Sequence, residues 1–385
     1  MTDGTAQFGF EIAATTGRAR AGVFHTPRGA VETPVFMPVG TLATVKALDP
    51  HDLRAMHVQI LLSNAYHLHL RPGDTLVRDL GGLHRFMAWD RPILTDSGGY
   101  QVFSLAALNS VSEDGVEFRS HLDGSLRAFT PERVMQIEAN LGADVIMQFD
   151  HVIPGQSEHA AAKDASERSI RWLMRCRKEF AALHAAEDAP RQSLFPIVQG
   201  GVHDDLRQDA ARAACSCGDW DGFAIGGLSV GEEKAAMYGV LDVCDAALPV
   251  DRPRYLMGVG YPEDLLEGVA RGVDLFDCVA PTRMGRNGSA LTSAGRINLK
   301  NAVHRADQRP IEDACGCATC RQFSRAYLRH LVAADEMLGP RLLSLHNVHF
   351  LIALMRRARS AIRAGTFDAW SREWLAHYHS TTADE

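Results

Sequence analysis

Three cysteines within six residues form the segment best suited to bind a metal ion in this chain of 385 residues. The segment reads Cys315-Gly-Cys317-Ala-Thr-Cys320, and two histidines follow in His346-Asn-Val-His349. Three thiolates and one imidazole suit a tetrahedral Zn²⁺, and four protein ligands leave no open position for catalysis. Ordinary buried thiols are the alternative, but the cluster contains three of only eight cysteines. The spacing therefore predicts one structural zinc ion, and the catalytic residues are expected upstream.

Upstream, two aspartates follow short apolar runs. Asp96 lies in Leu-Thr-Asp-Ser-Gly-Gly-Tyr-Gln and Asp277 in Leu-Phe-Asp-Cys-Val-Ala-Pro-Thr-Arg. Two carboxylates in one pocket allow the nucleophile and proton-transfer roles to be divided. In retaining glycoside chemistry, one carboxylate attacks the anomeric carbon and the other handles the leaving group. The pair predicts substitution at a sugar carbon, provided that the fold brings both side chains together.

Other residues near such runs suit a flat base on that sugar. Asp150 and Gln199 supply an acceptor and a mixed donor and acceptor for the edge of a purine-like base. The Gly226–Gly227 pair lets a flat ligand approach the backbone closely. Tyr100 and Met257 have the side chains for the two faces of a slot. These residues predict a site for an aromatic ring.

The charge distribution indicates where the sugar belongs. Arg283 and Arg286 follow Asp277 at positions suited to hold phosphates. Residues 282–365 contain fourteen Lys and Arg against five Asp and Glu, although the net charge of the chain is −7. Such asymmetry is typical of a protein with one face that meets phosphates, whereas a solvated helix surface is the alternative. We therefore expect chemistry on a nucleoside within a nucleic acid, with the target base extruded.

Eight short apolar runs indicate the fold that must position these residues. Continuous apolar runs suit strands buried on both faces of a parallel sheet. They cover residues 35–38, 59–62, 92–95, 145–149, 194–198, 222–225, 255–258 and 273–276. Eight strand–helix units over about 240 residues predict an α/β fold, the (β/α)₈ TIM barrel. We expect N-terminal antiparallel strands over 1–33, the barrel over 34–281 with an inserted hairpin near 115–129, and a zinc-binding subdomain with C-terminal helices over 282–385.

Six polar or glycine positions lie at the carboxyl ends of predicted strands. They are Asp96, Asp150, Gln199, Gly226, Gly258 and Asp277. A single Asp at such a position can simply cap the next helix, but six successive strand ends converge at one mouth of a barrel, where barrel enzymes build their sites. The pattern predicts an enzyme.

The ends and the composition indicate the compartment. The N-terminus lacks a basic start with an apolar core, and no run reaches the roughly 18 apolar residues of a membrane span. The cysteines are unevenly spaced, which fits a reducing compartment better than a disulfide framework. We expect a cytoplasmic protein.

Several motifs carry a resemblance to a known family. They are Leu-Thr-Asp-Ser-Gly-Gly-Tyr-Gln at 94–101, Phe-Ala-Ile-Gly-Gly-Leu at 223–228, Leu-Met-Gly-Val-Gly at 256–260, Phe-Asp-Cys-Val at 276–279 and Cys-x-Cys-x-x-Cys at 315–320. From about residue 8 to the C-terminal helix, the chain resembles the bacterial tRNA-guanine transglycosylases, or queuine tRNA-ribosyltransferases. The resemblance implies a TIM barrel with a zinc subdomain, and a homodimer.

The resemblance also implies a reaction. The anticodon wobble guanine of tRNAs with a GUN anticodon would be exchanged for a 7-deazaguanine, in queuosine biosynthesis. Asp277 would attack ribose C1′, expel guanine and form a covalent RNA–enzyme intermediate. Asp96 would act as the general base that removes a proton from the incoming base.

Binding residues follow from the same resemblance. It assigns the base to Asp96, Ser97, Gly98, Gly99, Tyr100, Asp150, Gln199, Gly226, Gly227, Leu228 and Met257. It assigns tRNA to Gly258, Val259, Gly260, Tyr261, Pro262, Glu263, Asp264, Thr282, Arg283, Met284, Gly285 and Arg286. It assigns zinc to Cys315, Cys317, Cys320 and His346, with His349 and His330 as rivals for the fourth position.

One departure concerns the incoming base. Many bacterial relatives have Cys two residues after the base-binding Asp, where this chain has Val152. A Val at this position resembles the sequence of the eukaryotic catalytic subunit, which takes the bulkier queuine. Eukaryotic forms, however, have Gly where this chain has Val230. We favour 7-aminomethyl-7-deazaguanine as the incoming base, with queuine salvage as the alternative.

Three rival functions are less consistent with the sequence. Archaeal relatives that modify the tRNA D-arm carry an added C-terminal RNA-binding domain, whereas this chain ends soon after its last helix. A non-catalytic partner subunit would be expected to lose Asp96 or Asp277. A zinc-containing barrel hydrolase of small nucleosides has no evident use for the basic C-terminal region.

Overall fold

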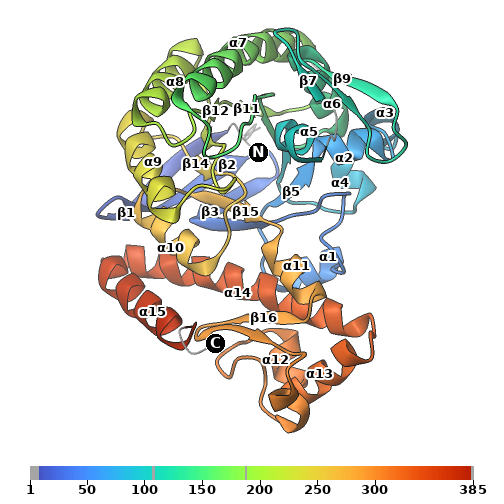
Figure 1. The fold of residues 1–385 in the computed structure, drawn as a ribbon, viewed down its shortest axis with the longest axis vertical. Helices are drawn as coiled ribbons and strands as arrows, with labels where there is room; N and C mark the ends of the chain where they lie inside the picture. The colour runs from blue at the N-terminus through green and yellow to red at the C-terminus, as the bar shows by residue number, and fades with distance from the viewer. Residues whose placement is uncertain (1–7, 106–108, 187–188, 383–385) are drawn as a thin grey trace, which may run out of the picture.

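Short parallel strands follow one another round a ring in the upper part of the molecule (Figure 1). The computed structural model describes residues 8–105, 109–186 and 189–382. One sheet has the strand order β11–β10–β6–β5, and a second has β12–β13–β14–β15–β4. Their bounds are β4 (Val35–Pro38), β5 (Leu61–Asn64), β6 (Ile93–Asp96), β10 (Val145–Met147), β11 (Ser193–Phe195), β12 (Ile197–Val198), β13 (Phe223–Ile225), β14 (Arg254–Leu256) and β15 (Leu275–Cys278).

Two connections close these sheets into one barrel. β11 and β12 are separated only by Pro196, which has no N–H to donate to a strand ladder. On the other side, Val39, which directly follows β4, forms a parallel bridge with Leu62 of β5. Since β11 and β12 share one strand position, the ring has eight positions. The predicted (β/α)₈ barrel is confirmed, and each predicted run overlaps one of its strands.

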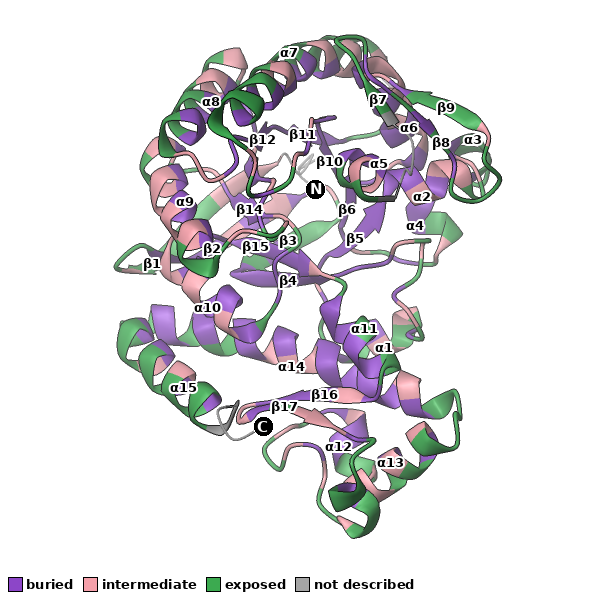
Figure 2. Cartoon of the chain, viewed as in Figure 1, coloured by how far each residue is buried: buried purple, intermediate pink, exposed green. Residues whose placement is uncertain are grey.

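Helices surround the ring and leave the strands buried (Figure 2). The larger ones are α6 (Pro131–Leu141), α7 (His159–Leu183), α8 (Asp204–Cys217), α9 (Lys234–Ala247) and α10 (Pro262–Ala270). Smaller ones follow the first strands: α1 (Pro50–Ala55), α2 (Ala65–Leu70), α3 (Asp74–Asp79), α4 (Gly82–Phe86) and α5 (Gly99–Leu105). Thr130 caps α6, because its hydroxyl accepts from the Arg133 N–H at 3.2 Å. Burial of the strands on both faces explains why their sequence lacks alternation.

An antiparallel sheet covers the amino ends of the barrel strands. It consists of β1 (Gly9–Thr16), β2 (Ala19–Thr26) and β3 (Gly29–Thr33). Phe24 packs edge-on against Phe195 of the barrel, with ring centroids 5.9 Å apart. Arg20 forms a buried ion pair with Asp274, which directly precedes β15. These contacts leave the carboxyl ends of the strands as the open mouth.

A three-stranded antiparallel sheet is inserted between α5 and α6. It contains β7 (Asn109–Val111), β8 (Val116–Arg119) and β9 (Leu126–Phe129). Gly124 in the tight turn between β8 and β9 has a φ of +71°, a conformation that glycine adopts without strain. Phe118 and Phe129 pack edge-on within the core, with centroids 5.1 Å apart.

A smaller C-terminal part lies below the barrel (Figure 1). It consists of α11 (Ala280–Arg286), β16 (Ser289–Thr292), β17 (Gly295–Asn298), the 3₁₀ helix Ala302–Ala306, α12 (Ala318–Gln322), α13 (Arg325–Ala333), α14 (Leu338–Arg363) and α15 (Phe367–Thr382). Within this part, α14 lies next to the barrel, between it and the remaining C-terminal elements, and packs closely on α11. A Cβ at Gly285 would lie 2.6 Å from the Ser344 nitrogen, so glycine is required for this approach.

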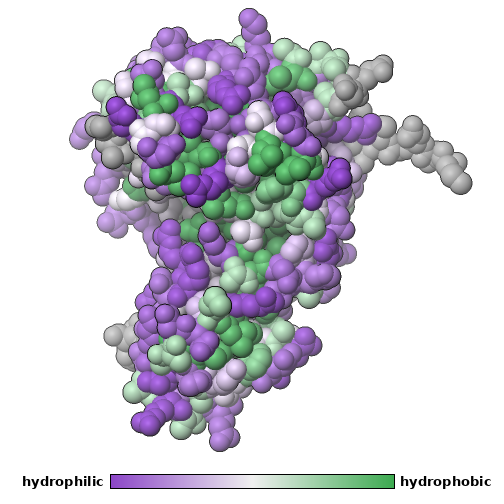
Figure 3. Space-filling view, turned by 90° about the vertical axis from the view of Figure 1, so that its right-hand side faces the viewer, coloured by the Kyte–Doolittle hydropathy of each residue, from purple (hydrophilic) through white to green (hydrophobic). Residues whose placement is uncertain are grey.

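The described helices include none that is both long and apolar enough to cross a membrane. On the face in Figure 3, hydrophobic residues form separate groups among hydrophilic ones.

Candidate active site and metal group

A cavity of about 720 Å³ lies at the carboxyl ends of the barrel strands. Among the six predicted strand-end residues, five line it: Asp96, Asp150, Gly226, Gly258 and Asp277. The sixth, Gln199, lies directly beside it. Its volume is within the range of small-molecule sites. The two aspartates, 181 positions apart in the sequence, therefore share one cavity.

Asp96, the last residue of β6, is surrounded by hydrogen-bond donors. Its Oδ2 accepts from the side-chain amides of Asn64 and of Gln101, the latter at 3.0 Å, and its Oδ1 accepts from the Ala65 N–H at 3.2 Å. Burial raises the pKa of Asp96 to about 7, an effect that the charge of Asp277 increases and the donors oppose. A carboxyl with such a pKa can take up and release a proton near neutral pH.

Asp277 lies in β15 and is held through one oxygen. Its Oδ1 accepts from the Tyr255 hydroxyl at 2.6 Å and from the Gly258 N–H at 2.7 Å. Burial raises the pKa of Asp277, whereas these two donors lower it because they stabilise the carboxylate. Both donors contact the same oxygen, so Oδ2 carries neither bond and is available for another partner.

Asp150 and Gln199 form a second polar pair at neighbouring strand ends. Gln199 Nε2 donates to Asp150 Oδ2 at 2.6 Å, and burial raises the pKa of Asp150 to about 6. Among the described residues, the buried Oε1 of Gln199 has no hydrogen-bond partner. The pair therefore presents both acceptors and donors, as the edge of a purine-like base requires.

Glycines bring the backbone close to this pair. A Cβ at Gly99 would lie 2.5 Å from Asp150 Oδ1, and one at Gly227 would lie 2.2 Å from Gln199 Oε1. Gly227 also has a φ of +64°, in the left-handed region. Any side chain at either position would displace the polar pair.

Nearly all other predicted site residues line the same cavity. These are Ser97, Gly98, Gly99, Tyr100, Gly227, Leu228, Met257, Val259, Gly260, Tyr261, Asp264, Thr282, Arg283, Met284 and Arg286. Tyr100 is 49% exposed, so part of its side chain is accessible to a ligand in the cavity. Arg283 and Arg286 are exposed on α11 at the rim.

Four predicted residues do not line the cavity. Besides Gln199 these are Pro262 and Glu263 in the first turn of α10, and Gly285, which faces α14. The Glu263 carboxylate instead contacts Lys234 Nζ at 2.9 Å. For Gly285, the structure supports a role in the packing of α11 against α14, because a Cβ there would collide with Ser344.

Three residues that contact the two aspartates were missed at the sequence level. Asn64 and Gln101 donate to Asp96, and Tyr255 donates to Asp277. Asn64 is a polar residue at the end of β5, so the strand-end pattern could have revealed it if the strand had been extended by two residues. Tyr255 lies inside an apolar strand, where an aromatic residue reads as core.

The described residues include one cluster suited to a metal ion. The ligand atoms of Cys315, Cys317, Cys320 and His346 all lie within 4.8 Å of one another. From His346 Nδ1 to the three sulfurs the distances are 3.7, 3.6 and 3.2 Å. Metal–ligand bonds of about 2.0–2.3 Å in a tetrahedron would separate the ligands by roughly 3.3–3.8 Å. The four side chains therefore fit a tetrahedral metal ion.

The second nitrogen of His346 supports its choice as fourth ligand. His346 Nε2 lies 2.7 Å from the Leu291 carbonyl oxygen, which can only accept, so the proton belongs on Nε2 and Nδ1 is free for a metal. His349 Nδ1 approaches only Cys315, at 3.5 Å, and His330 packs on Tyr327. Neither rival belongs to the four-residue cluster.

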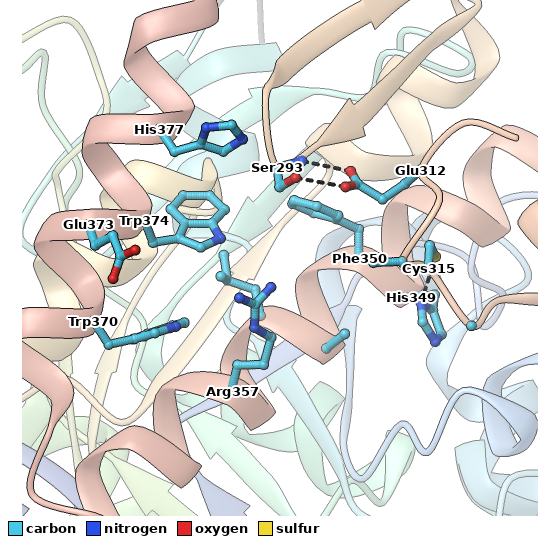
Figure 4. Close-up of a pocket in the computed structure, with 14 residues that line it drawn as sticks. Ser293, Glu312, Cys315, His349, Phe350, Arg357, Trp370, Glu373, Trp374 and His377 are labelled. Atoms are coloured by element: carbon cyan, nitrogen blue, oxygen red, sulfur yellow. Dashed lines mark hydrogen bonds between the residues drawn. The ribbon is translucent and has the colours of Figure 1, made fainter. Parts of the chain in front are cut away.

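A second cavity, of about 460 Å³, adjoins the metal group (Figure 4). Phe350 and Arg357 of α14 and Trp370 and Trp374 of α15 surround it. Cys315 lines this cavity, and no residue lines both cavities. The metal group thus lies apart from the two aspartates, which fits a structural ion better than a catalytic one.

Comparison with known proteins agrees with these features. A family model described as queuine tRNA-ribosyltransferase matches residues 15–380. A queuine tRNA-ribosyltransferase of Herpetosiphon aurantiacus is 53% identical over 373 residues, which cover 97% of this chain and 93% of the relative. One of Sphingopyxis alaskensis is 53% identical over 372 residues, covering 97% and 98%, and one of Caldanaerobacter subterraneus subsp. tengcongensis is 51% identical over 362 residues, covering 94% and 95%. The chain belongs to the queuine tRNA-ribosyltransferase family.

Proposed function

We propose that this chain is a tRNA-guanine transglycosylase, a pentosyltransferase that exchanges the wobble guanine of tRNAs with a GUN anticodon for 7-aminomethyl-7-deazaguanine. The exchange would serve queuosine biosynthesis. The observation that carries the proposal is that Asp96 and Asp277 line one cavity beside the Asp150–Gln199 pair, in a member of this family. Both carboxylates are present, which argues against the alternative of a non-catalytic tRNA-binding partner subunit.

In the first half of the proposed reaction, Asp277 is the nucleophile. A carboxylate oxygen attacks ribose C1′ as the C1′–N9 bond breaks. Guanine leaves with the bonding electrons and takes up a proton from solvent, and the proton that Asp96 accepts in the second half is returned to solvent. The Tyr255 and Gly258 donors hold Oδ1, so Oδ2 is the oxygen we assign to the attack. The product is an ester between Asp277 and C1′ of the tRNA.

In the second half, Asp96 acts as the general base. The incoming base loses its N9 proton to Asp96 and attacks C1′, and the Asp277 carboxylate leaves. The pKa of about 7 suits this role, because the carboxyl can accept the proton near neutral pH and release it again. The bonds broken and formed at C1′ balance over the two steps, without net change of the enzyme.

The cavity lining supports the proposed binding roles. Asp150, Gln199 and Gly227 would read the edge of the base, and Tyr100 and Met257 would lie on its two faces. The segments 258–264 and 282–286 would contact tRNA, with phosphates held at the exposed rim arginines. We assign a tRNA with a GUN anticodon as partner.

We further propose that the ion of the Cys315, Cys317, Cys320 and His346 cluster is Zn²⁺. Three thiolates with one imidazole in a closed tetrahedral arrangement is a donor set typical of structural zinc. Bound zinc would hold the loop before α12 against α14. The homodimer implied by the resemblance and the cytoplasmic location expected from the composition both stay predictions.

Queuine is a second candidate for the incoming base, favoured by Val152, which lines the cavity together with Val230. We expect 7-aminomethyl-7-deazaguanine to be incorporated into matched tRNA with a kcat/KM about tenfold or more above that of queuine, because Val230 restricts room for the larger base. Val230→Gly should raise the kcat/KM of queuine, and Val152→Cys serves as control at the other position. Preferential use of queuine by the wild type would contradict the proposed substrate.

Asp277→Asn should abolish the covalent tRNA–protein adduct seen on denaturing gels of enzyme incubated with tRNA, because an amide is a far weaker nucleophile than a carboxylate. A thermal unfolding curve close to that of the wild type would show that the fold is kept. Tyr255→Phe is the matched control: it removes one donor to Oδ1 and should slow adduct formation without abolishing it. An undiminished adduct in Asp277→Asn would exclude this residue as nucleophile.

The rate of base incorporation should rise with pH through about 7 and fall about tenfold per pH unit below it, because Asp96 is then protonated. Asn64→Ala removes a donor that stabilises the Asp96 carboxylate, so its pKa should rise and the limb of the pH–rate profile should move to higher pH. Single-turnover rates across about pH 5–9 measure the pH–rate profiles of the wild type and of Asn64→Ala. A limb that does not move in the variant would assign it to another group.

Cys317→Ala should lower the zinc content of the purified protein from about one ion per chain and destabilise the C-terminal part, because structural zinc binding is coupled to folding. Elemental analysis and urea denaturation measure the two effects. Cys244→Ala, which removes a buried thiol from α9 outside the cluster, should leave the zinc content unchanged. A full zinc content in Cys317→Ala would show that the ligand set is wrong.

A further inference from the structure

Arg207, in the first turn of α8, is fully buried behind the strand ends that carry the base-binding residues. Its guanidinium donates to three backbone carbonyls: Nη1 to Val198 at 2.7 Å and Gly226 at 2.9 Å, and Nε to Gly201 at 2.8 Å. The Val198 and Gly201 carbonyls lie on either side of Gln199, which directly follows β12, and the Gly226 carbonyl belongs to the glycine pair after β13. One cation thus ties together the two segments that read the base in the proposed function.

Burial of this cation is costly in free energy. Among the described residues, the Arg207 guanidinium forms hydrogen bonds only with backbone carbonyls and no ion pair with a carboxylate, and its Nη2 has no hydrogen-bond partner. Burial therefore lowers the pKa of the guanidinium. An apolar side chain of similar volume is often neutral or stabilising in place of a buried ion. An apolar residue, however, could not form the three charge-assisted hydrogen bonds that Arg207 donates to the carbonyls.

The bond to the Gly226 carbonyl determines how the Gly226–Gly227 peptide is oriented. In a trans peptide the C=O and the N–H point in opposite directions. Since the Gly226 oxygen points to Arg207, away from the cavity, the Gly227 N–H points to the opposite side, where both glycines line the cavity. No hydrogen bond within the described part of the chain uses this N–H.

Without Arg207, little would hold this peptide. Rotation of a peptide plane changes ψ of the first residue and φ of the second, and glycine permits nearly all values of both angles. Gly227 already has a φ of +64°. Side chains at these positions, which would restrict the rotation, are excluded by contacts with Ile197 and Gln199.

We propose that Arg207 is a positioning residue for base recognition, which holds the Gly226 carbonyl so that the Gly227 N–H is presented to an acceptor on the edge of the incoming base. The inference rests on the proposed function of this cavity. Arg207 touches neither substrate nor reacting atoms. Its loss should weaken base binding more than tRNA binding or the chemical step.

The test is Arg207→Met, with Arg207→Gln as a second variant in case the first does not fold. With radiolabelled guanine and matched tRNA, the KM for guanine should rise about tenfold, the effect of losing one well-placed hydrogen bond to the base. The KM for tRNA should stay within about twofold, because the rim residues are unchanged. Thermal unfolding measures the general loss of stability separately.

Arg359→Met is the matched control. Arg359 is buried on α14 and donates to the carbonyls of Gly22 and Thr33, both at 2.6 Å, far from the mouth. The Arg359→Met variant should be less stable than the wild type but have an unchanged KM for guanine. An equal rise in the KM for guanine in this control, or a wild-type value in a folded Arg207 variant, would overturn the inference. Absence of guanine exchange in the wild type would instead contradict the proposed function, and this inference with it.

Discussion

The structure depends on the burial of two carboxylates in one cavity. Each would be costly to bury as a charge, and each is therefore given donors: three for Asp96 and two for Asp277. The donors do not fully compensate for lost water, so the pKa of Asp96 rises to about 7 and that of Asp277 also rises. The two side chains differ in their surroundings, which allows a division of roles between nucleophile and base. Strands, helices and glycines around them can be understood as the means of holding this pair.

The barrel meets this requirement through very short strands. Its strands have only two to four residues, so neighbouring strands pair through only two to four residues before their ends reach the mouth. Asp96, Asp150, Gln199 and Asp277 each occur at or just after such an end, and the ring brings them together. The amino ends are covered by β1–β3, with the Arg20–Asp274 ion pair at their junction. One end of the barrel is thus closed for stability and the other is open for chemistry.

The metal group is linked to the mouth through α14 and its contacts with β16 and α11. His346 contacts the Leu291 carbonyl, and the next residue, Asn347, accepts from the Leu291 N–H and donates to the carbonyls of Pro281 and Ser289. Gly285 lets α11 approach the same helix. These contacts run from the four ligands to the helix that carries the rim arginines. A structural ion can in this way position a proposed RNA-binding surface that it does not touch.

By itself, the sequence determined the features that depend on local spacing. The cysteine cluster, the apolar runs and the polar residue after each run are short-range patterns, and the geometry of parallel barrels then implies that the strand ends converge. Only the tertiary structure decided which groups touch those residues. Asn64 reaches Asp96 and Tyr255 reaches Asp277, each from the neighbouring strand, and the spacing along the sequence encodes neither contact. The choice of His346 over His349 depends on the rotation of α14. Arg207 is buried because α8 packs this side chain against two strand ends, where it donates to the carbonyls of Val198 and Gly226. Local patterns are determined by residue type, whereas burial and hydrogen-bond partners depend on how distant segments pack.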